Sequence, residues 1–161
     1  MPVSSVQFGQ DPWSYANGLK ISNNATTPNT KVDVAVGSIL DSTGVYQINL
    51  DTAVTINAAT TGINALDTGV LVLNTFYTIY AIGDPVNANV TGCIISANGT
   101  SPLMPFGYSA YAKIGYIATD ASVHFLKGYW TAGNSNFRLF MYDDPQATAV
   151  TAGNNTAYAT G

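Results

Sequence analysis

Apolar residues alternate with polar or small ones along much of this chain, and this period of two constrains the fold more than any other feature. Val32, Val34 and Val36 follow it, and so do residues 46–50 and 54–56. A β-strand turns successive side chains to opposite faces, so the pattern predicts strands with one buried and one exposed face. No window of about eleven or more residues repeats with the helical period of about 3.6.

Further apolar runs, separated by Gly, Asn and Pro, predict more strands. The run 70–83 is apolar on both faces, which favours a central strand covered on both sides, with the other sheet and a neighbouring subunit as the covers. Ser42-Thr43-Gly44 predicts a hairpin turn. About eight to ten short strands predict an all-β fold, specifically a jelly-roll-like antiparallel β-sandwich. The later strands are expected over 91–96, 111–119, 124–130 and 137–142.

Composition divides the chain into an N-terminal arm (1–18), a β-sandwich domain (19–146) and a C-terminal tail (147–161). The arm mixes proline and glycine with aromatic residues, and these breakers disfavour regular structure. Aromatic side chains on a loose arm would expose apolar surface, so they either pack on the chain's own sandwich or anchor it to a partner. The candidate interface residues are Phe8, Trp13 and Tyr15.

Charge is scarce in this sequence. Charged residues make up 9% of the chain and none is glutamate, whereas an average soluble domain has about 25%. A surface of hydroxyl and amide groups makes close protein contacts without desolvating ions, which favours a subunit of an assembly. The net charge of −4 and the lack of a basic stripe disfavour nucleic-acid binding. No apolar run reaches the roughly 20 residues of a membrane span, so we expect no membrane partner.

The triplet Asp67-Thr68-Gly69 matches the active-site triplet of aspartic proteases. That chemistry needs two such carboxylates sharing a proton, which one chain supplies only as a dimer. It also needs an apolar strand containing glycine behind the loop that carries the triplet, and Ile114-Gly115 is a weak match to that requirement. The alternative is a structural turn in which the aspartate side chain caps backbone amides. We favour the turn and expect no enzymatic activity.

Other residues with chemical potential have structural interpretations as well. His124 is interpreted as a surface or interface residue, and Cys93 as a small core residue. Asp143-Asp144 could bind Ca²⁺ with loop carbonyls, although an exposed acidic turn is the commoner case. We predict no catalytic residue, no metal site and no cofactor. Some aromatic residues could stack on sugar rings, but core packing and subunit contact are the more frequent uses of Tyr and Trp. The aromatic residues concerned are Trp13, Tyr15, Tyr108, Tyr129 and Trp130.

From about residue 18 to residue 120 the chain resembles a segment found in bacteriophage tail-fibre and other virion proteins. The resemblance implies a β-rich, oligomeric virion module without catalytic residues. A short free-standing module of this kind suits a capsid decoration (cement) protein that binds the major capsid protein, with a tail-fibre or tail-adaptor component that binds carbohydrate as the alternative. It implies a homo-oligomer, preferably a trimer, assembled in the host cytoplasm. The matching stretches are 18–26, 34–38, 41–43, 66–69, 101–108 and 114–117.

Overall fold

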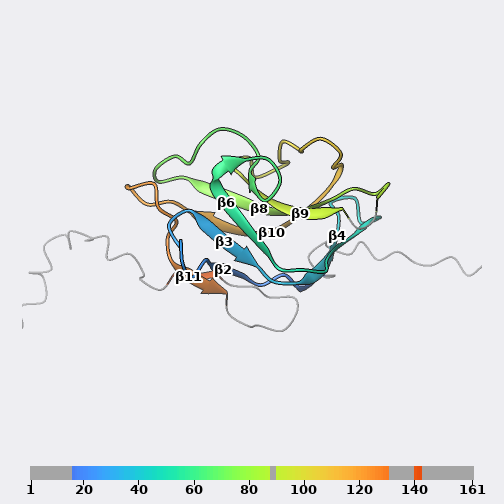
Figure 1. Cartoon of the computed structure of the whole chain (residues 1–161), viewed down its shortest axis with the longest axis horizontal. Coiled ribbons are helices and arrows are strands. Elements are labelled where there is room, and N and C mark those ends of the chain that lie inside the picture. The colour runs from blue at the N-terminus through green and yellow to red at the C-terminus, as the bar shows by residue number, and fades with distance from the viewer. Residues whose placement is uncertain (1–15, 88–89, 131–139, 143–161) are drawn as a thin grey trace, which may run out of the picture.

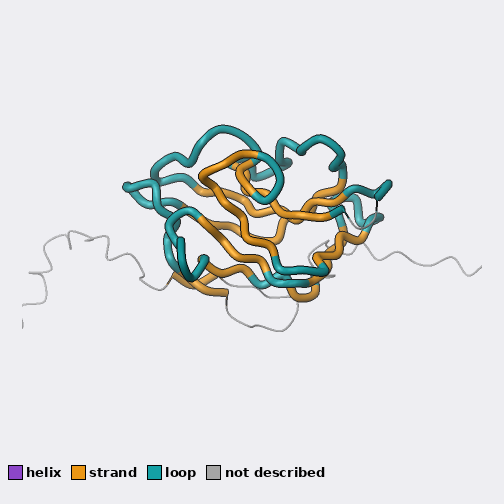
Figure 2. The backbone as a smooth tube through the Cα atoms, viewed as in Figure 1, coloured by secondary structure: helices purple, strands orange, loops and turns teal. Residues whose placement is uncertain are grey.

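A computed structural model describes residues 16–87, 90–130 and 140–142, and this part of the chain contains twelve strands and no helix (Figures 1 and 2). The all-β prediction is confirmed. No helix in these described ranges could cross a membrane. The strands are β1 (Asn17–Gly18), β2 (Ile21–Asn23), β3 (Lys31–Val34), β4 (Gly37–Leu40), β5 (Gln47–Leu50), β6 (Val54–Thr61), β7 (Ala65–Leu66), β8 (Phe76–Gly83), β9 (Thr91–Ser96), β10 (Ala110–Ala118), β11 (Gly128–Trp130) and β12 (Phe140–Tyr142).

The strands form two sheets. The smaller has the order β1-β4-β5, and the larger has the order β10-β8-β9-β7-β6-β3-β2-β11-β12. The described fold begins inside the predicted arm, because Ala16 is buried in the core and β1 pairs with β4. β1 and β4 approach so closely that a Cβ atom on Gly37 would lie 2.3 Å from the carbonyl oxygen of Asn17. Only glycine fits at this contact.

The larger sheet is mixed, so the prediction of a purely antiparallel sandwich is wrong at one strand. β7 pairs in parallel with both of its neighbours, β6 and β9. Residues 62–64 connect β6 to β7, and Gly62 and Asn64 both have positive φ there. Asn64 then donates its backbone N–H to the carbonyl of Cys93 and accepts the N–H of Cys93 on its side chain. These contacts hold β7 beside β9.

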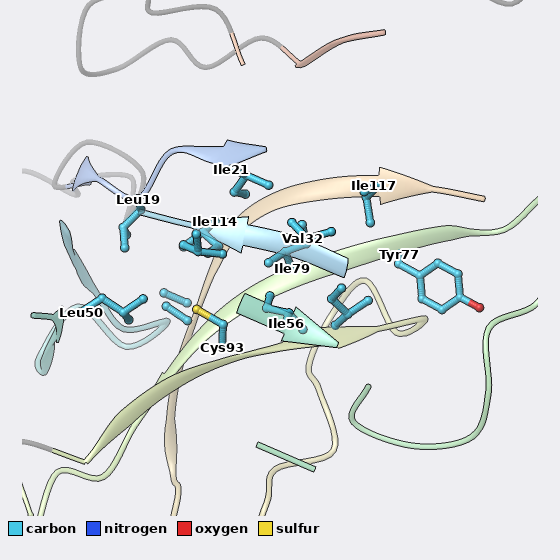
Figure 3. Packing of buried hydrophobic residues seen from close by; sticks show 14 of the residues in the cluster. Leu19, Ile21, Val32, Leu50, Ile56, Tyr77, Ile79, Cys93, Ile114 and Ile117 are labelled. Atoms are coloured by element: carbon cyan, nitrogen blue, oxygen red, sulfur yellow. The ribbon is translucent and has the colours of Figure 1, made fainter. Parts of the chain in front are cut away.

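The main core is lined by alternate residues of β3, β5, β6, β8 and β9, joined by residues of β2, β4, β7 and β10 (Figure 3). Four isoleucines expected in the core, Ile48, Ile56, Ile79 and Ile114, are at most 1% exposed, and their placement is confirmed. Val36 was expected to continue the buried alternation but is 52% exposed. The strand ends two residues earlier, at the bend between β3 and β4, which interrupts the alternation.

The predicted strand over 70–83 begins only at Phe76, and residues 70–75 form a loop. The loop closes one end of the fold: the backbone N–H of Val72 donates to the hydroxyl of Tyr77, and that of Asn74 to the carbonyl of Asp120. β8 itself is buried on both faces from Tyr77 onward, as expected. Its second face is covered by the chain's own loop 97–109.

Two further predictions concern a turn and a strand. The hairpin turn at 42–44 is confirmed, since it joins β4 to β5. The strand expected over 124–130 begins at Gly128, because the side chain of Asp120 accepts the backbone N–H groups of Ser122 and His124 and holds a turn there.

Candidate interaction surface

The side chain of Asp67, the candidate protease aspartate, supports a neighbouring loop. One carboxylate oxygen accepts the backbone N–H of Leu103 at 2.9 Å. Ile114-Gly115 lies in β10, which pairs with β8 and not with the triplet. Gly69 has φ +75, so the triplet ends in a left-handed turn. The aspartate therefore caps a backbone amide, as the structural interpretation of the triplet expects.

The other candidate groups are separated in the fold. Cys93 is fully buried in β9, and burial raises the pKa of its thiol well above the ordinary range, so the reactive thiolate is disfavoured. His124 is on the surface, with Nδ1 3.9 Å from a carboxylate oxygen of Asp120. The pKa of Asp120 is lowered, chiefly by the backbone hydrogen bond from His124. Within the described ranges, no three His, Cys, Asp or Glu side chains are placed to hold a metal ion.

The best-defined surface feature is the loop 97–109, which crosses the outer face of β8 and β9. It begins with a turn in which the Asn98 side chain accepts the backbone N–H of Thr100 at 2.9 Å. The hydroxyl of Tyr80 donates to the carbonyl of Asn98 at 2.8 Å. The loop is held again where Leu103 meets Asp67, and it ends where Ser109 donates its N–H to the carbonyl of Gly83. Three hydrogen bonds to other elements, together with the turn at its start, hold this thirteen-residue loop in place.

Side chains of this loop also build a second small core. Met104 and Tyr108 pack against Tyr80, Ile82 and Ile94 on the outer face of the sheet. Tyr80 and Tyr111 meet edge to face, with ring centroids 5.8 Å apart. Burial raises the pKa of Tyr80. Burial also raises the pKa of Tyr108, and the negative charge of Asp84 raises it further. The loop is therefore fixed by packing as well as by hydrogen bonds.

At the tip of the loop a tight turn projects Phe106 into solvent. The backbone N–H of Tyr108 donates to the carbonyl of Pro105 at 3.1 Å, and Gly107 has φ +87. This combination is a type II turn, in which glycine supplies the positive φ at the third position. Phe106 occupies the second position and is wholly exposed, and Leu103 is 62% exposed. The turn thus presents an aromatic ring with no packing partner among the described residues.

A neighbouring loop adds more apolar surface. Figure 1 shows the two loops on the same side of the molecule, and the hydrogen bond between Asp67 and Leu103 joins them. The first residue of β8, Phe76, is 73% exposed, and Tyr116 of β10 is 46% exposed beside it on the same sheet. The exposed aliphatic residues of this second loop are Val70, Val72 and Leu73.

These two loops lie in an almost uncharged part of the chain. Between Asp67 and Lys113 the sequence contains one charged residue, Asp84. Asp84 has local partners, the side chain of Asn87 and the backbone N–H of Val86, and these hydrogen bonds lower its pKa. We call the surface formed by loops 67–75 and 97–109 with Phe76 and Tyr116 the apolar loop surface. Isolated exposed apolar residues are normal, but a group on two hydrogen-bonded loops whose one charged residue is Asp67 is typical of an interaction site.

Several residues singled out in the sequence lie outside the described residues: Phe8, Trp13, Tyr15 and Asp143-Asp144. Tyr129 and Trp130 lie in β11. Tyr108, the remaining candidate for sugar stacking, is part of the second small core. The sequence interpretation missed Phe106, although Pro105-Phe106-Gly107 carries the composition of a tight turn with an aromatic at its tip.

Comparison with protein-family models, curated proteins and solved structures finds nothing that matches this chain.

Proposed function

We propose that this chain is a bacteriophage virion structural protein, a capsid decoration protein that binds the outer surface of the assembled shell. The observation that carries the proposal is Phe106, wholly exposed at the tip of an anchored and uncharged loop. The stretch 101–108, which contains it, is also one of the segments that resemble phage virion proteins. In this proposal the fold is a variant of the jelly-roll sandwich.

The apolar loop surface has the physical properties of an attachment site. Aromatic side chains at interfaces often contribute about 2 kcal/mol or more each when truncated to alanine. A loop already held by hydrogen bonds loses little conformational entropy on binding, so more of that energy remains as affinity. Asp67 is the one charged residue of this surface, and its carboxylate already accepts the N–H of Leu103, so contact requires little further desolvation of ions.

The mechanism of stabilisation is mass action. A protein that binds the assembled shell and not its free subunits stabilises the shell by RT ln(1 + [L]/Kd), about 2.7 kcal/mol per site at one hundred times Kd. The chain acts as a homo-oligomer, preferably a trimer, and attachment through several subunits at once raises the apparent affinity further. The aromatic residues of the arm, Phe8, Trp13 and Tyr15, provide additional contacts.

The proposal assigns no catalytic role to Asp67. Its hydrogen bond to the N–H of Leu103 supports a structural role, that of holding the attachment loop. The alternative within the virion is a tail-fibre or tail-adaptor component with a carbohydrate receptor.

Immunogold electron microscopy on particles of the phage that encodes this chain tests the location. Label distributed over the capsid supports the decoration role. Label confined to the tail favours the alternative, and unlabelled particles overturn both.

A matched pair of variants tests the surface. Phe106→Ser removes the exposed ring, and Val86→Ser changes an apolar residue in another loop that is 88% exposed. Co-sedimentation with shells lacking this protein should fall about tenfold or more for Phe106→Ser and remain unchanged for Val86→Ser. Equal binding by both variants would remove Phe106 from the attachment site.

A further inference from the structure

The turn that opens loop 97–109 contains an Asn-Gly pair in an unusual setting. Asn98 and Gly99 are both exposed. The side-chain oxygen of Asn98 accepts two backbone N–H groups, from Thr100 at 2.9 Å and from Ser101 at 3.4 Å. Within the described residues, the backbone N–H of Gly99 has no hydrogen-bond acceptor.

We propose that Asn98 is a site of spontaneous modification, at which the chain converts the asparagine to aspartate and isoaspartate through a cyclic imide. The backbone nitrogen of Gly99 attacks Cγ of Asn98 and forms a new N–C bond. The bond from Cγ to the side-chain nitrogen breaks, the attacking nitrogen gives up its proton, and ammonia leaves. Water then opens the ring at either carbonyl, so the net change is the replacement of ammonia by water.

Two features of the site favour this reaction. Glycine has no Cβ atom to obstruct the approach of its own nitrogen to the neighbouring side chain. The N–H groups of Thr100 and Ser101 point at the side-chain oxygen, where negative charge develops during the attack, and donors placed there stabilise such a transition state. The departing ammonia leaves into solvent because Asn98 is exposed.

The chain holds two natural controls, each with one of the two features. Asn17 also precedes a glycine, but Asn17 and Gly18 are paired with β4, and the Asn17 side-chain oxygen accepts no backbone N–H among the described residues. Asn24 accepts two backbone N–H groups, from Thr26 at 3.1 Å and Thr27 at 2.9 Å, but precedes alanine. Its side-chain nitrogen is also held by both carboxylate oxygens of Asp33 at 3.0 Å.

The consequence for the loop is local. Isoaspartate lengthens the main chain by one carbon between residues 98 and 99, and either product adds a negative charge. The carbonyl of Asn98 accepts the hydroxyl of Tyr80, so this anchor of the loop is strained by the longer backbone.

Peptide mass spectrometry of the full-length chain, incubated at mildly alkaline pH, tests the inference. In urea, Asn17 and Asn98 should convert at similar rates, because both precede glycine. In the native chain, Asn98 should convert at least about tenfold faster than Asn17, a barrier difference of about 1.4 kcal/mol, and Asn24 should remain intact. Native conversion of Asn98 no faster than that of Asn17 would overturn the proposal.

Gly99→Ala tests the route. A Cβ atom at this position would lie 3.8 Å from the hydroxyl oxygen of Thr78, an ordinary contact, so the variant should keep its melting temperature. Conversion of Asn98 in this variant should fall about tenfold or more, and conversion at the wild-type rate would exclude the cyclic imide. If the variant is unstable, the conversion rates of Asn98 and Asn17 in the wild-type chain, native and in urea, still test the proposal.

Discussion

The carboxylate of Asp67 accepts the backbone N–H of Leu103 at 2.9 Å, and this contact joins two loops that lie 36 residues apart in the sequence. Asp67 follows β7 and leads into loop 67–75, whereas Leu103 lies midway along loop 97–109. The hydrogen bond therefore ties the two halves of the apolar loop surface together. It also gives the aspartate of the protease-like triplet a structural role.

Asp67→Ala should loosen loop 97–109 more than it destabilises the fold. The N–H of Leu103 is on an exposed residue and can bond to water, so we expect the free energy of unfolding to fall by about 1 kcal/mol or less. Hydrogen exchange at the Leu103 amide should become clearly faster. Asp67→Asn keeps an acceptor oxygen and should show a smaller change, and unchanged exchange in both variants would contradict the role of Asp67.

Ile79→Ala should destabilise the fold strongly. Ile79 is fully buried in β8, and removing its branches leaves a cavity, for which losses of about 2–5 kcal/mol are typical. Val86→Ala, at an exposed loop position, should change stability by less than about 0.5 kcal/mol. Urea unfolding curves of both variants measure the difference. A loss below about 0.5 kcal/mol at Ile79 would mean that the core face of β8 is wrongly assigned.

The buried carboxylate of Asp41 should make the hairpin between β4 and β5 sensitive to acid. Burial raises its pKa, but hydrogen bonds from the N–H of Tyr46, the hydroxyl of Thr43 and the N–H of Val45 outweigh burial, so the net shift is downward. A carboxyl whose folded pKa is lowered adds stability above its ordinary pKa of about 3.9, and this stability is lost as the pH falls through the folded value.

Asp41→Asn is the matched variant, because its amide oxygen can still accept the same backbone N–H groups. It should be less stable than the wild type at pH 7, and the gap should narrow as the pH falls below about 4. Melting temperatures measured between neutral and acid pH follow this gap. A gap that stays constant would show that the charge of Asp41 contributes nothing.

Gly37→Ala should disrupt the pairing of β1 with β4. Its Cβ atom would lie 2.3 Å from the carbonyl oxygen of Asn17 and 2.4 Å from the backbone nitrogen of Leu19, so the two strands must separate. We expect a loss of about 3 kcal/mol, the upper range for overpacking. Gly44→Ala is the control: φ is +72 but nothing lies within 4 Å, so only left-handed strain of about 1–2 kcal/mol is expected. A smaller loss for Gly37 than for Gly44 would contradict the close approach.

Deleting residues 1–15 tests the predicted interface residues Phe8, Trp13 and Tyr15. If the arm binds a partner, the truncated chain should keep its melting temperature and lose binding to shells or self-association, as read by co-sedimentation and light scattering. If the arm packs on its own domain, the melting temperature should fall, since about 1 kcal/mol moves a domain of this size by about 2–6 °C. If neither the melting temperature nor binding changes, the arm has no role in attachment, and the apolar loop surface remains the proposed attachment site.

Several strands and much of the core were predictable because they follow from local alternation, whereas β1, β2, β4 and β7 were not predicted. The period of two marks Ile48 and Ile56 as inward-facing from a few neighbouring residues, and both are buried. The turn at 42–44 was predictable for the same reason, since its residue types favour a reversal regardless of the rest of the chain. The scarcity of charge between Asp67 and Lys113 is likewise a property of the sequence alone.

Tertiary structure decided which apolar residues remain exposed. Val72 and Phe76 continue an apolar run, but the chain bends at residues 70–75 to close the end of the fold, so their side chains face solvent. Nothing near Asp67 in the sequence identifies Leu103 as its partner, because that contact exists only after β7 has paired in parallel with β9 and loop 97–109 has crossed the sheet. Alternation records which side of a strand is apolar, whereas the partner of a loop depends on how distant elements pack.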